Sequence, residues 1–136
     1  GKEWKMEINW LAVIVAGASS LVLGAVWYSP ILFANRWMAA AGLNEEQLKS
    51  GSMPMIFGGA FLLSLIAALV FSMFLGPKPA LGFAVGAGLS AGLCWVAAGL
   101  GISYLFERRP LGLFLINGGY FTLQFTLFGA ILSLLG

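Results

Sequence analysis

Residues 10–30 read WLAVIVAGASSLVLGAVWYSP, an apolar stretch without a charged side chain that ends at a proline. Its length meets the roughly 20 residues that a helix needs to cross a hydrocarbon core about 30 Å thick. Trp10 lies near one end and Trp27 near the other, and amphipathic aromatic rings prefer the headgroup level. Because Pro30 cannot continue a helix, we expect a membrane-spanning helix at about Trp10–Ser29.

Three further apolar runs have the same length and carry no charge. They are Met55–Leu75, Leu81–Tyr104 and Leu111–Leu135. The second and third connections are short, and short connections make consecutive helices antiparallel neighbours. The sequence therefore predicts an all-α polytopic membrane protein, with four transmembrane helices in an antiparallel bundle that forms a single domain over residues 1–136.

The composition supports this fold class. Of 136 residues, 60% are hydrophobic and only 9% are charged, whereas an ordinary soluble domain is about 25% charged. So few polar groups cannot cover the surface of a soluble fold of this size. The net charge of +2 is too small to indicate a polyanionic partner. A soluble domain, a disordered chain and a nucleic-acid binder are all disfavoured.

The first connection contains a short apolar segment that cannot span a membrane. Ile31–Leu43 surrounds a single charge at Arg36, and we expect it to lie in the interface or to pack on the bundle. Asn44 and Gln47 match a capping box for a short helix that follows. Ser52 is positioned to cap the second span.

The basic residues predict an orientation. Residues 1–5 precede Met6, which we take as the natural start, so they are interpreted as an addition to the native chain. From Met6 onwards the second connection holds only Lys78, while the other two hold Arg36, Lys49, Arg108 and Arg109. The positive-inside rule then places both termini outside, unless Lys2 and Lys5 are native. The stretch Glu107–Arg109 is either this topology signal or a site for lipid phosphate.

Asn117, Tyr120 and Gln124 form the clearest polar set within a span. Their spacing puts them on one face of the fourth helix, called here the polar face. Polar groups in hydrocarbon need partners, and polar residues at this depth are functional candidates. The polar face can line a small cavity, or it can form hydrogen bonds between helices.

A dense aromatic segment follows the first span. We treat it as a candidate interfacial motif, which can bind lipid headgroups or a partner. The alternative is an ordinary aromatic belt combined with helix termination. The residues of this aromatic segment are Trp27, Tyr28, Ser29, Pro30, Phe33 and Trp37.

The residues that usually carry catalysis are scarce. The chain has no histidine and one cysteine, Cys94, so His/Cys metal sites of the usual types and Ser-His-Asp or Cys-His catalysis are excluded. Cys94 also has no partner for a disulfide within the chain. We expect a protein that is not an enzyme and that has no catalytic residues, no metal and no cofactor.

Small residues predict how the helices pack. In the third span large aliphatic side chains form one narrow stripe, and most other positions are Gly, Ala, Ser or Cys. Small surfaces let helices approach closely in lipid. We therefore expect the third helix to be the most buried.

The fourth helix has a second face unsuited to lipid, which carries Thr122, Thr126 and Gly129. If that face packs inside the bundle, the polar face points outward, and a homo-oligomer with the fourth helix near its axis would satisfy the polar groups. The reversed arrangement also puts the fourth helix at the interface. The competing account is a monomer that satisfies the polar face internally. The partners considered for it are backbone groups, Ser64 and Ser90.

Several motifs resemble those of an uncharacterised bacterial family of short four-span membrane proteins with a domain of unknown function. The first is the sequence INWLAV at 8–13, and the second is Gly24-x-x-Trp-Tyr-Ser-Pro-x-Leu-Phe-x-x-x-Trp37. Ile116-Asn117-x-Gly119-Tyr120 and GAIL at 129–132 are similar to the family's last span. Relatives often have a histidine where this chain has Phe121. The resemblance covers residues 6–136 and implies a bacterial cytoplasmic membrane and four spans, but no activity.

The sequence thus predicts a multi-pass protein of the bacterial cytoplasmic membrane whose surroundings are the lipid bilayer. The leading functional expectation is a non-enzymatic protein that self-associates or serves as an accessory subunit. Its expected partners are further copies in a homo-oligomer or a larger membrane complex, and no nucleic acid. The alternative is a transporter or channel for a small molecule or ion that uses the polar face.

Overall fold

The structure is a computed structural model that describes residues 7–136. Every regular element in this range is helical, which confirms the predicted fold class. The proposed addition at residues 1–5 and the start at Met6 lie outside the described residues. Four helices within the described range are long and apolar enough to cross a membrane, and the third of them is continuous through three segments. They are α1 (Trp10–Trp27), α4 (Met53–Leu75), the third span (Leu81–Glu107) and α7 (Leu111–Leu135).

Polar caps fix where the first two spans begin. Asn9 accepts a 3.0 Å hydrogen bond at Oδ1 from the backbone N–H of Ala12, and Ser52 accepts one from Met55 at the start of α4. Helix α1 ends two residues earlier than expected. The reason is that the chain turns at Tyr28 before the proline is reached, and there the N–H of Tyr28 donates to the Gly24 carbonyl oxygen and the N–H of Ser29 to that of Val26.

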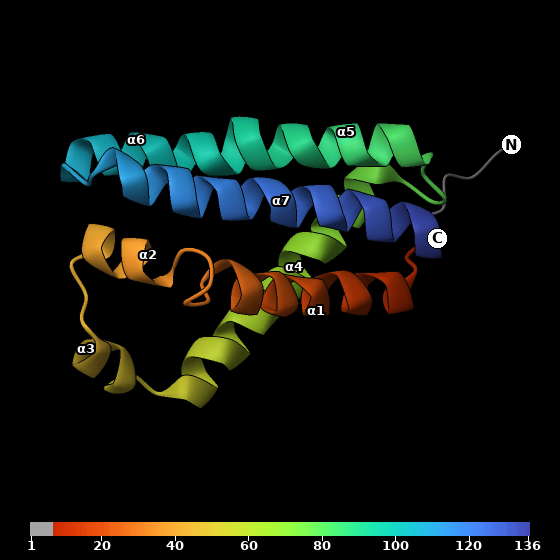
Figure 1. Cartoon of the computed structure of the whole chain (residues 1–136). Coiled ribbons are helices and arrows are strands. Elements are labelled where there is room, and N and C mark those ends of the chain that lie inside the picture. Colours follow the sequence, from red (N-terminus) through yellow and green to blue (C-terminus); the bar gives the residue numbers. More distant parts are fainter. Residues whose placement is uncertain (1–6) are drawn as a thin grey trace, which may run out of the picture.

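The first connection folds into two short helices. Helix α2 (Ala34–Ala41) ends at Gly42, whose φ of 73° is a left-handed conformation that favours glycine. Helix α3 (Glu45–Lys49) has the predicted capping box, with hydrogen bonds in both directions between Asn44 and Gln47. The predicted interfacial segment is α2, and it packs against α7 (Figure 1).

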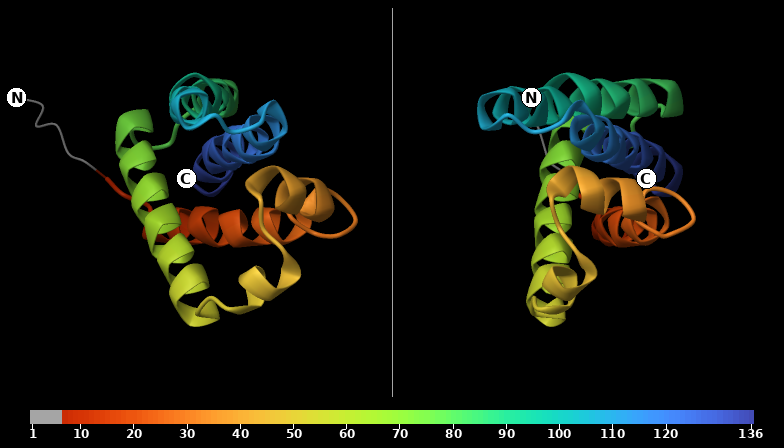
Figure 2. Two further views of the ribbon diagram at one scale, coloured as in Figure 1. Left: turned by 90° about the vertical axis from the view of Figure 1, so that its left-hand side faces the viewer. Right: turned by 60° about the vertical axis from the view of Figure 1, so that its left-hand side comes forward.

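Helix α7 is the centre of the arrangement. It contacts α1, α2, α4 and every segment of the third span (Figures 1 and 2). The prediction that the third helix is the most buried is wrong, because only the side of the third span that faces α7 is covered. Its last segment, α6 (Ala98–Glu107), has no buried residue.

The third span contains a wide turn. Helix α5 (Leu81–Ala91) continues into a π-helical segment, η1 (Gly92–Ala97), and then into α6. Small residues along the span face α7, and their spacing is four, four, five and four residues. They are Ala84, Gly88, Gly92, Ala97 and Gly101. The extra residue lies at η1, where an i→i+5 hydrogen-bond pattern accommodates it.

Glycine allows very close contact at this interface. A Cβ atom at Gly88 would overlap the backbone carbonyl oxygen of Phe125, and one at Gly129 would overlap that of Ala84. The backbones of α5 and α7 therefore touch directly, as expected for small residues between membrane helices.

Helix α4 crosses the others obliquely (Figure 2). It packs mainly on α1, where a Cβ atom at Gly17 would lie 2.7 Å from Leu65 Cδ2. Towards the inside it contributes Ala68 and Phe71 to a core that also contains Phe128 of α7. Helix α4 diverges from the third span, so the arrangement is open on that side.

Candidate functional site: a polar cluster between three spans

The polar face of α7 points into the protein. Gln124 is 5% exposed, and its Nε2 donates a 2.8 Å hydrogen bond to Oγ of Ser20, which is 1% exposed. One turn earlier, the Tyr120 hydroxyl donates to the backbone oxygen of Ser20 over 2.8 Å. Gly24 faces the Tyr120 ring, and a Cβ there would be in ordinary contact with the ring at 3.7 Å. Two residues of α7 thus bind one residue of α1.

Asn117 joins the first and third spans to α7. Its Oδ1 accepts a 2.6 Å hydrogen bond from the Tyr28 hydroxyl, and its Nδ2 donates to the Tyr104 hydroxyl over 2.9 Å. Tyr28 follows α1, and Tyr104 lies in α6. The amide therefore uses both of its ends, each towards a different span. We call the joined set the polar cluster: Ser20, Tyr28, Tyr104, Asn117, Tyr120 and Gln124.

The aromatic segment packs on the same region. Trp27 Nε1 donates to the carbonyl oxygen of Ile116 over 2.8 Å, and the Trp27 ring lies 4.7 Å from that of Phe33. Tyr28 contacts both Trp37 and Tyr120, with ring centroids 5.6 Å and 5.5 Å apart. The aromatic segment and the polar face, which are separate candidates in the sequence, therefore form one continuous contact region.

Ser29 and Pro30 play a more local part. Ser29 Oγ donates to the carbonyl oxygen of Val26, and the Ser29 carbonyl accepts from the backbone of Leu32 and Ala34. Both residues lie in the turn that brings α2 back towards α7. They shape the aromatic segment without joining the polar cluster.

Two members of the polar cluster, Ser20 and Tyr104, are absent from the candidates that the sequence indicates. Tyr104 enters the predictions only as the last residue of the third apolar run. The available signal for Ser20 was its hydroxyl, which lies within the first span at a depth where it can meet the Gln124 amide of the fourth. Nothing local indicated Tyr104, because its position opposite Asn117 depends on the wide turn at η1.

One premise of the oligomer expectation is wrong. The polar face does not point out of the protein, and its hydrogen-bond partners come from the same chain. The opposite face of α7 is also covered internally, by α5 and η1. The side chains that bind the polar face are those of Ser20, Tyr28 and Tyr104, and not those of Ser64 or Ser90. The Oγ of Ser90 donates to the Gly86 carbonyl oxygen within its own helix.

The buried polar side-chain atoms of the protein are hydrogen-bonded. Among residues 7–136, no fully buried side-chain nitrogen or oxygen lacks a hydrogen-bond partner. The same residues contain no group of three His, Cys, Asp or Glu side chains arranged to hold a metal ion. The hydrogen bonds of the polar cluster link α7 to the first and third spans.

Two apolar grooves run along the outside of the third span. The α4 groove has a volume of about 310 Å³ and separates the third span from α4. The α6 groove has a volume of about 400 Å³ and lies between α6 and α7. The polar face lines neither of them, and Tyr104 is the single member of the polar cluster that borders one.

A family model described as "Protein of unknown function (DUF1761)" matches residues 11–133. The chain belongs to the DUF1761 family. No curated protein and no solved structure matches the chain. The matched range includes all six residues of the polar cluster, and membership of a family of unknown function agrees with the resemblance seen in the sequence.

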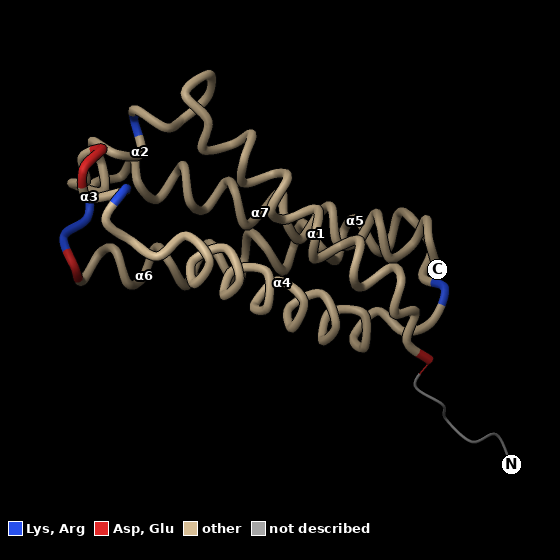
Figure 3. Tube along the Cα trace, turned by 90° about the horizontal axis from the view of Figure 1, so that it is seen from below, with Lys and Arg blue, Asp and Glu red and all other residues tan. Residues whose placement is uncertain are grey.

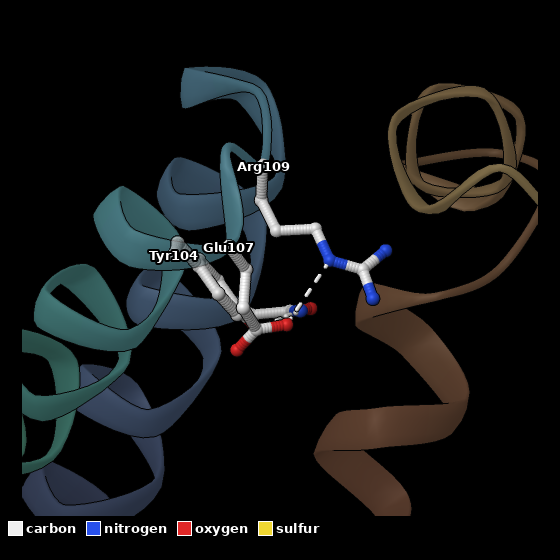
Figure 4. Close-up of polar contacts among 4 residues, drawn as sticks. Tyr104, Glu107 and Arg109 are labelled. Carbon is white, nitrogen blue, oxygen red and sulfur yellow. Dashed lines mark hydrogen bonds and ion pairs between the residues drawn. The ribbon is translucent and has the colours of Figure 1, made fainter.

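Charged residues of this DUF1761 protein gather at the two ends of the spans (Figure 3). The end that carries α2 and α3 holds most of the described basic residues, while the opposite end holds Glu7 and Lys78. At the first end, Arg109 Nε and Glu107 Oε1 form an exposed ion pair at 3.3 Å (Figure 4). The basic residues of this end are Arg36, Lys49, Arg108 and Arg109.

Proposed function

We propose that this multi-pass membrane protein is a non-enzymatic component of the bacterial cytoplasmic membrane that self-associates through its third span. Its four apolar helices are suited to a membrane, and the family match adds no activity. The proposal keeps the expected homo-oligomer and moves its interface from α7 to the third span.

A row of exposed small residues on the third span carries the proposal. We call it the small-residue face: Gly82, Gly86, Ser90 and Cys94, each four residues after the one before and each exposed. No atom lies within 4 Å of a Cβ built at Gly82 or Gly86. Helices in lipid associate through surfaces of this kind, because small side chains let two backbones approach.

The neighbouring surface fits a second helix. The small-residue face borders the α4 groove, which Ser90 and Cys94 line together with Phe71, Phe74 and Phe83. Trp95 stands beside it with 74% of its surface exposed. In a two-fold arrangement the small-residue face of one copy lies against that of the other. The α4 groove of each copy can then receive the Trp95 side chain of its partner.

Other exposed faces have a different character. The outer surface of α4 carries large side chains such as Met55, Leu62 and Leu63, which are 77%, 58% and 67% exposed. Large flexible side chains suit contact with lipid tails. The contrast between these two surfaces favours the third span as the site of protein contact.

The geometry gives less support to a transporter that uses the polar face. Asn117, Tyr120 and Gln124 are hydrogen-bonded to neighbouring spans, and they do not line the α4 or the α6 groove. A transport path along them would have to break these bonds. Self-association requires no such rearrangement.

Cys94 provides a direct test of the interface. Membranes containing the protein are treated with a thiol oxidant, and covalent dimers are detected by mass. The parent is expected to form a dimer linked through Cys94, and Gly86→Leu is expected to abolish it by separating the helices. Gly58→Leu is the matched control, because Gly58 is exposed on α4 with no atom within 4 Å of its Cβ. A parent that stays monomeric in the membrane and in mild detergent would overturn the proposal.

A further inference from the structure

The α6 groove combines an apolar wall with a basic group at one end. Its wall consists of side chains from α6 and α7 that suit hydrocarbon, and Tyr104, Arg109 and Pro110 also border it. The apolar residues of the wall are Ala98, Gly101, Ile102, Leu105, Leu111 and Phe114. A volume of about 400 Å³ is within the range of about 300–1,000 Å³ that small-molecule sites occupy.

The groove runs from the end of the spans towards their middle. Arg109 lies in the connection between α6, which ends at Glu107, and α7, which begins at Leu111. This connection marks the level at which the hydrocarbon core gives way to headgroups. Ala98 lies nearly three helical turns deeper at the start of α6. The basic end and the apolar wall thus match the two regions of a phospholipid.

The side chain of Arg109 is available to an anion. It is 45% exposed, and its ion pair with Glu107 uses Nε. Figure 4 shows the two terminal guanidinium nitrogens beyond that contact. Within residues 7–136 neither of them forms a hydrogen bond, so a planar pair of donors remains for phosphate oxygens.

Glycine creates the depth of the groove. A Cβ atom at Gly101 would lie 3.2 Å from the Phe114 ring, which is tighter than an ordinary contact. A larger side chain at Gly101 would therefore compete with Phe114 for the space that forms the wall.

We propose that the α6 groove binds one membrane phospholipid with an anionic headgroup. The headgroup phosphate pairs with Arg109, and an acyl chain lies along α6 over Gly101. The connection carries Glu107, Arg108 and Arg109 and therefore has a net positive charge. This charge selects an anionic lipid over a zwitterionic one. This inference is independent of the proposed self-association, since it concerns the groove on the α7 side of α6.

The test measures retained lipid on the whole protein by native mass spectrometry. The protein is released from micelles that contain equal amounts of phosphatidylglycerol and phosphatidylcholine. Arg109→Gln is compared with Arg36→Gln, which removes an exposed charge of the same end on α2. Ala98→Trp, which fills the groove, is compared with Gly99→Trp, because Gly99 is exposed but does not line it.

The parent is expected to retain phosphatidylglycerol preferentially. Arg109→Gln should lower the ratio of the two retained lipids about fivefold, which corresponds to the roughly 1 kcal/mol of one basic residue beside anionic lipid. Arg109→Lys should keep most of the preference, which separates loss of charge from loss of folding. Ala98→Trp should reduce retention of both lipids. The proposal is overturned if Arg109→Gln matches Arg36→Gln, or if Ala98→Trp retains as much lipid as Gly99→Trp.

Discussion

Gln124 and Ser20 are 104 positions apart in the chain, and they meet through a 2.8 Å hydrogen bond between two buried side chains. The carbonyl oxygen of the same serine accepts from Tyr120. Hydrocarbon offers no water to replace these bonds. The contact therefore fixes both the rotation of α7 and its height relative to α1.

The first prediction concerns this pair. Ser20→Ala leaves the Gln124 amide without its acceptor and should destabilise the protein by about 1–3 kcal/mol. Gln124→Leu removes the amide, so adding Ser20→Ala to it should cost less than Ser20→Ala alone. A double-mutant cycle on unfolding in mixed micelles should give a coupling energy near 0.6 kcal/mol, the average for such bonds in membranes. Strict additivity of the two changes would contradict the assignment.

The second prediction concerns Asn117, which bridges two tyrosines. Tyr28→Phe and Tyr104→Phe each remove one hydrogen bond and keep the ring. Asn117→Leu removes both bonds at once and should lower the thermal midpoint in detergent more than either single tyrosine change. If Asn117→Leu is as stable as Tyr104→Phe, the bridge does not contribute to stability.

The third prediction compares two glycines of α5 that are two residues apart. Gly88→Ala would overlap a backbone carbonyl of α7, which cannot move as a side chain does, and the cost of overpacking is typically about 1–3 kcal/mol. Gly86→Ala meets nothing within 4 Å and adds a better helix former. Thermal unfolding of both variants, measured on the monomer in a dissociating detergent, should show a loss only for Gly88→Ala. Equal midpoints would mean that α5 and α7 are not in backbone contact.

The fourth prediction concerns orientation. The end with α2 and α3 carries four described basic residues, Arg36, Lys49, Arg108 and Arg109, and should face the cytoplasm. In a Cys94→Ala background, Lys78→Cys should react with an impermeant thiol reagent added to intact cells. Ser50→Cys should react only after permeabilisation. Labelling of Ser50→Cys in intact cells would show that the protein has the opposite orientation.

Local signals in the sequence were sufficient for the helices. The bounds of α7 match the apolar run at 111–135, and the capping box at Asn44 is present, because both depend on residues near in sequence. Periodicity also put Asn117 and Gln124 on one face. It could not identify Tyr28 as the partner of Asn117, since that contact joins residues 89 positions apart.

The error about the third helix has a physical origin as well. The prediction treats its small residues as one surface to be buried, whereas the structure divides them between a face packed on α7 and the exposed small-residue face. The sequence of one helix does not reveal how many other helices pack against it. Helix α4 leans away from the third span, so part of the third span's surface stays exposed there.

The wide turn at Gly92–Ala97 has a consequence for chain length. One residue less in this segment would make the spacing of the small residues four throughout, and a regular α-helix accommodates that spacing without the wide turn. An α-helix through the present six residues would instead turn α6 by about 100° relative to α5 and move Tyr104 away from Asn117. Homologous proteins of this architecture should therefore tolerate a one-residue deletion in the segment, or substitution of the exposed Trp95, more readily than a further insertion.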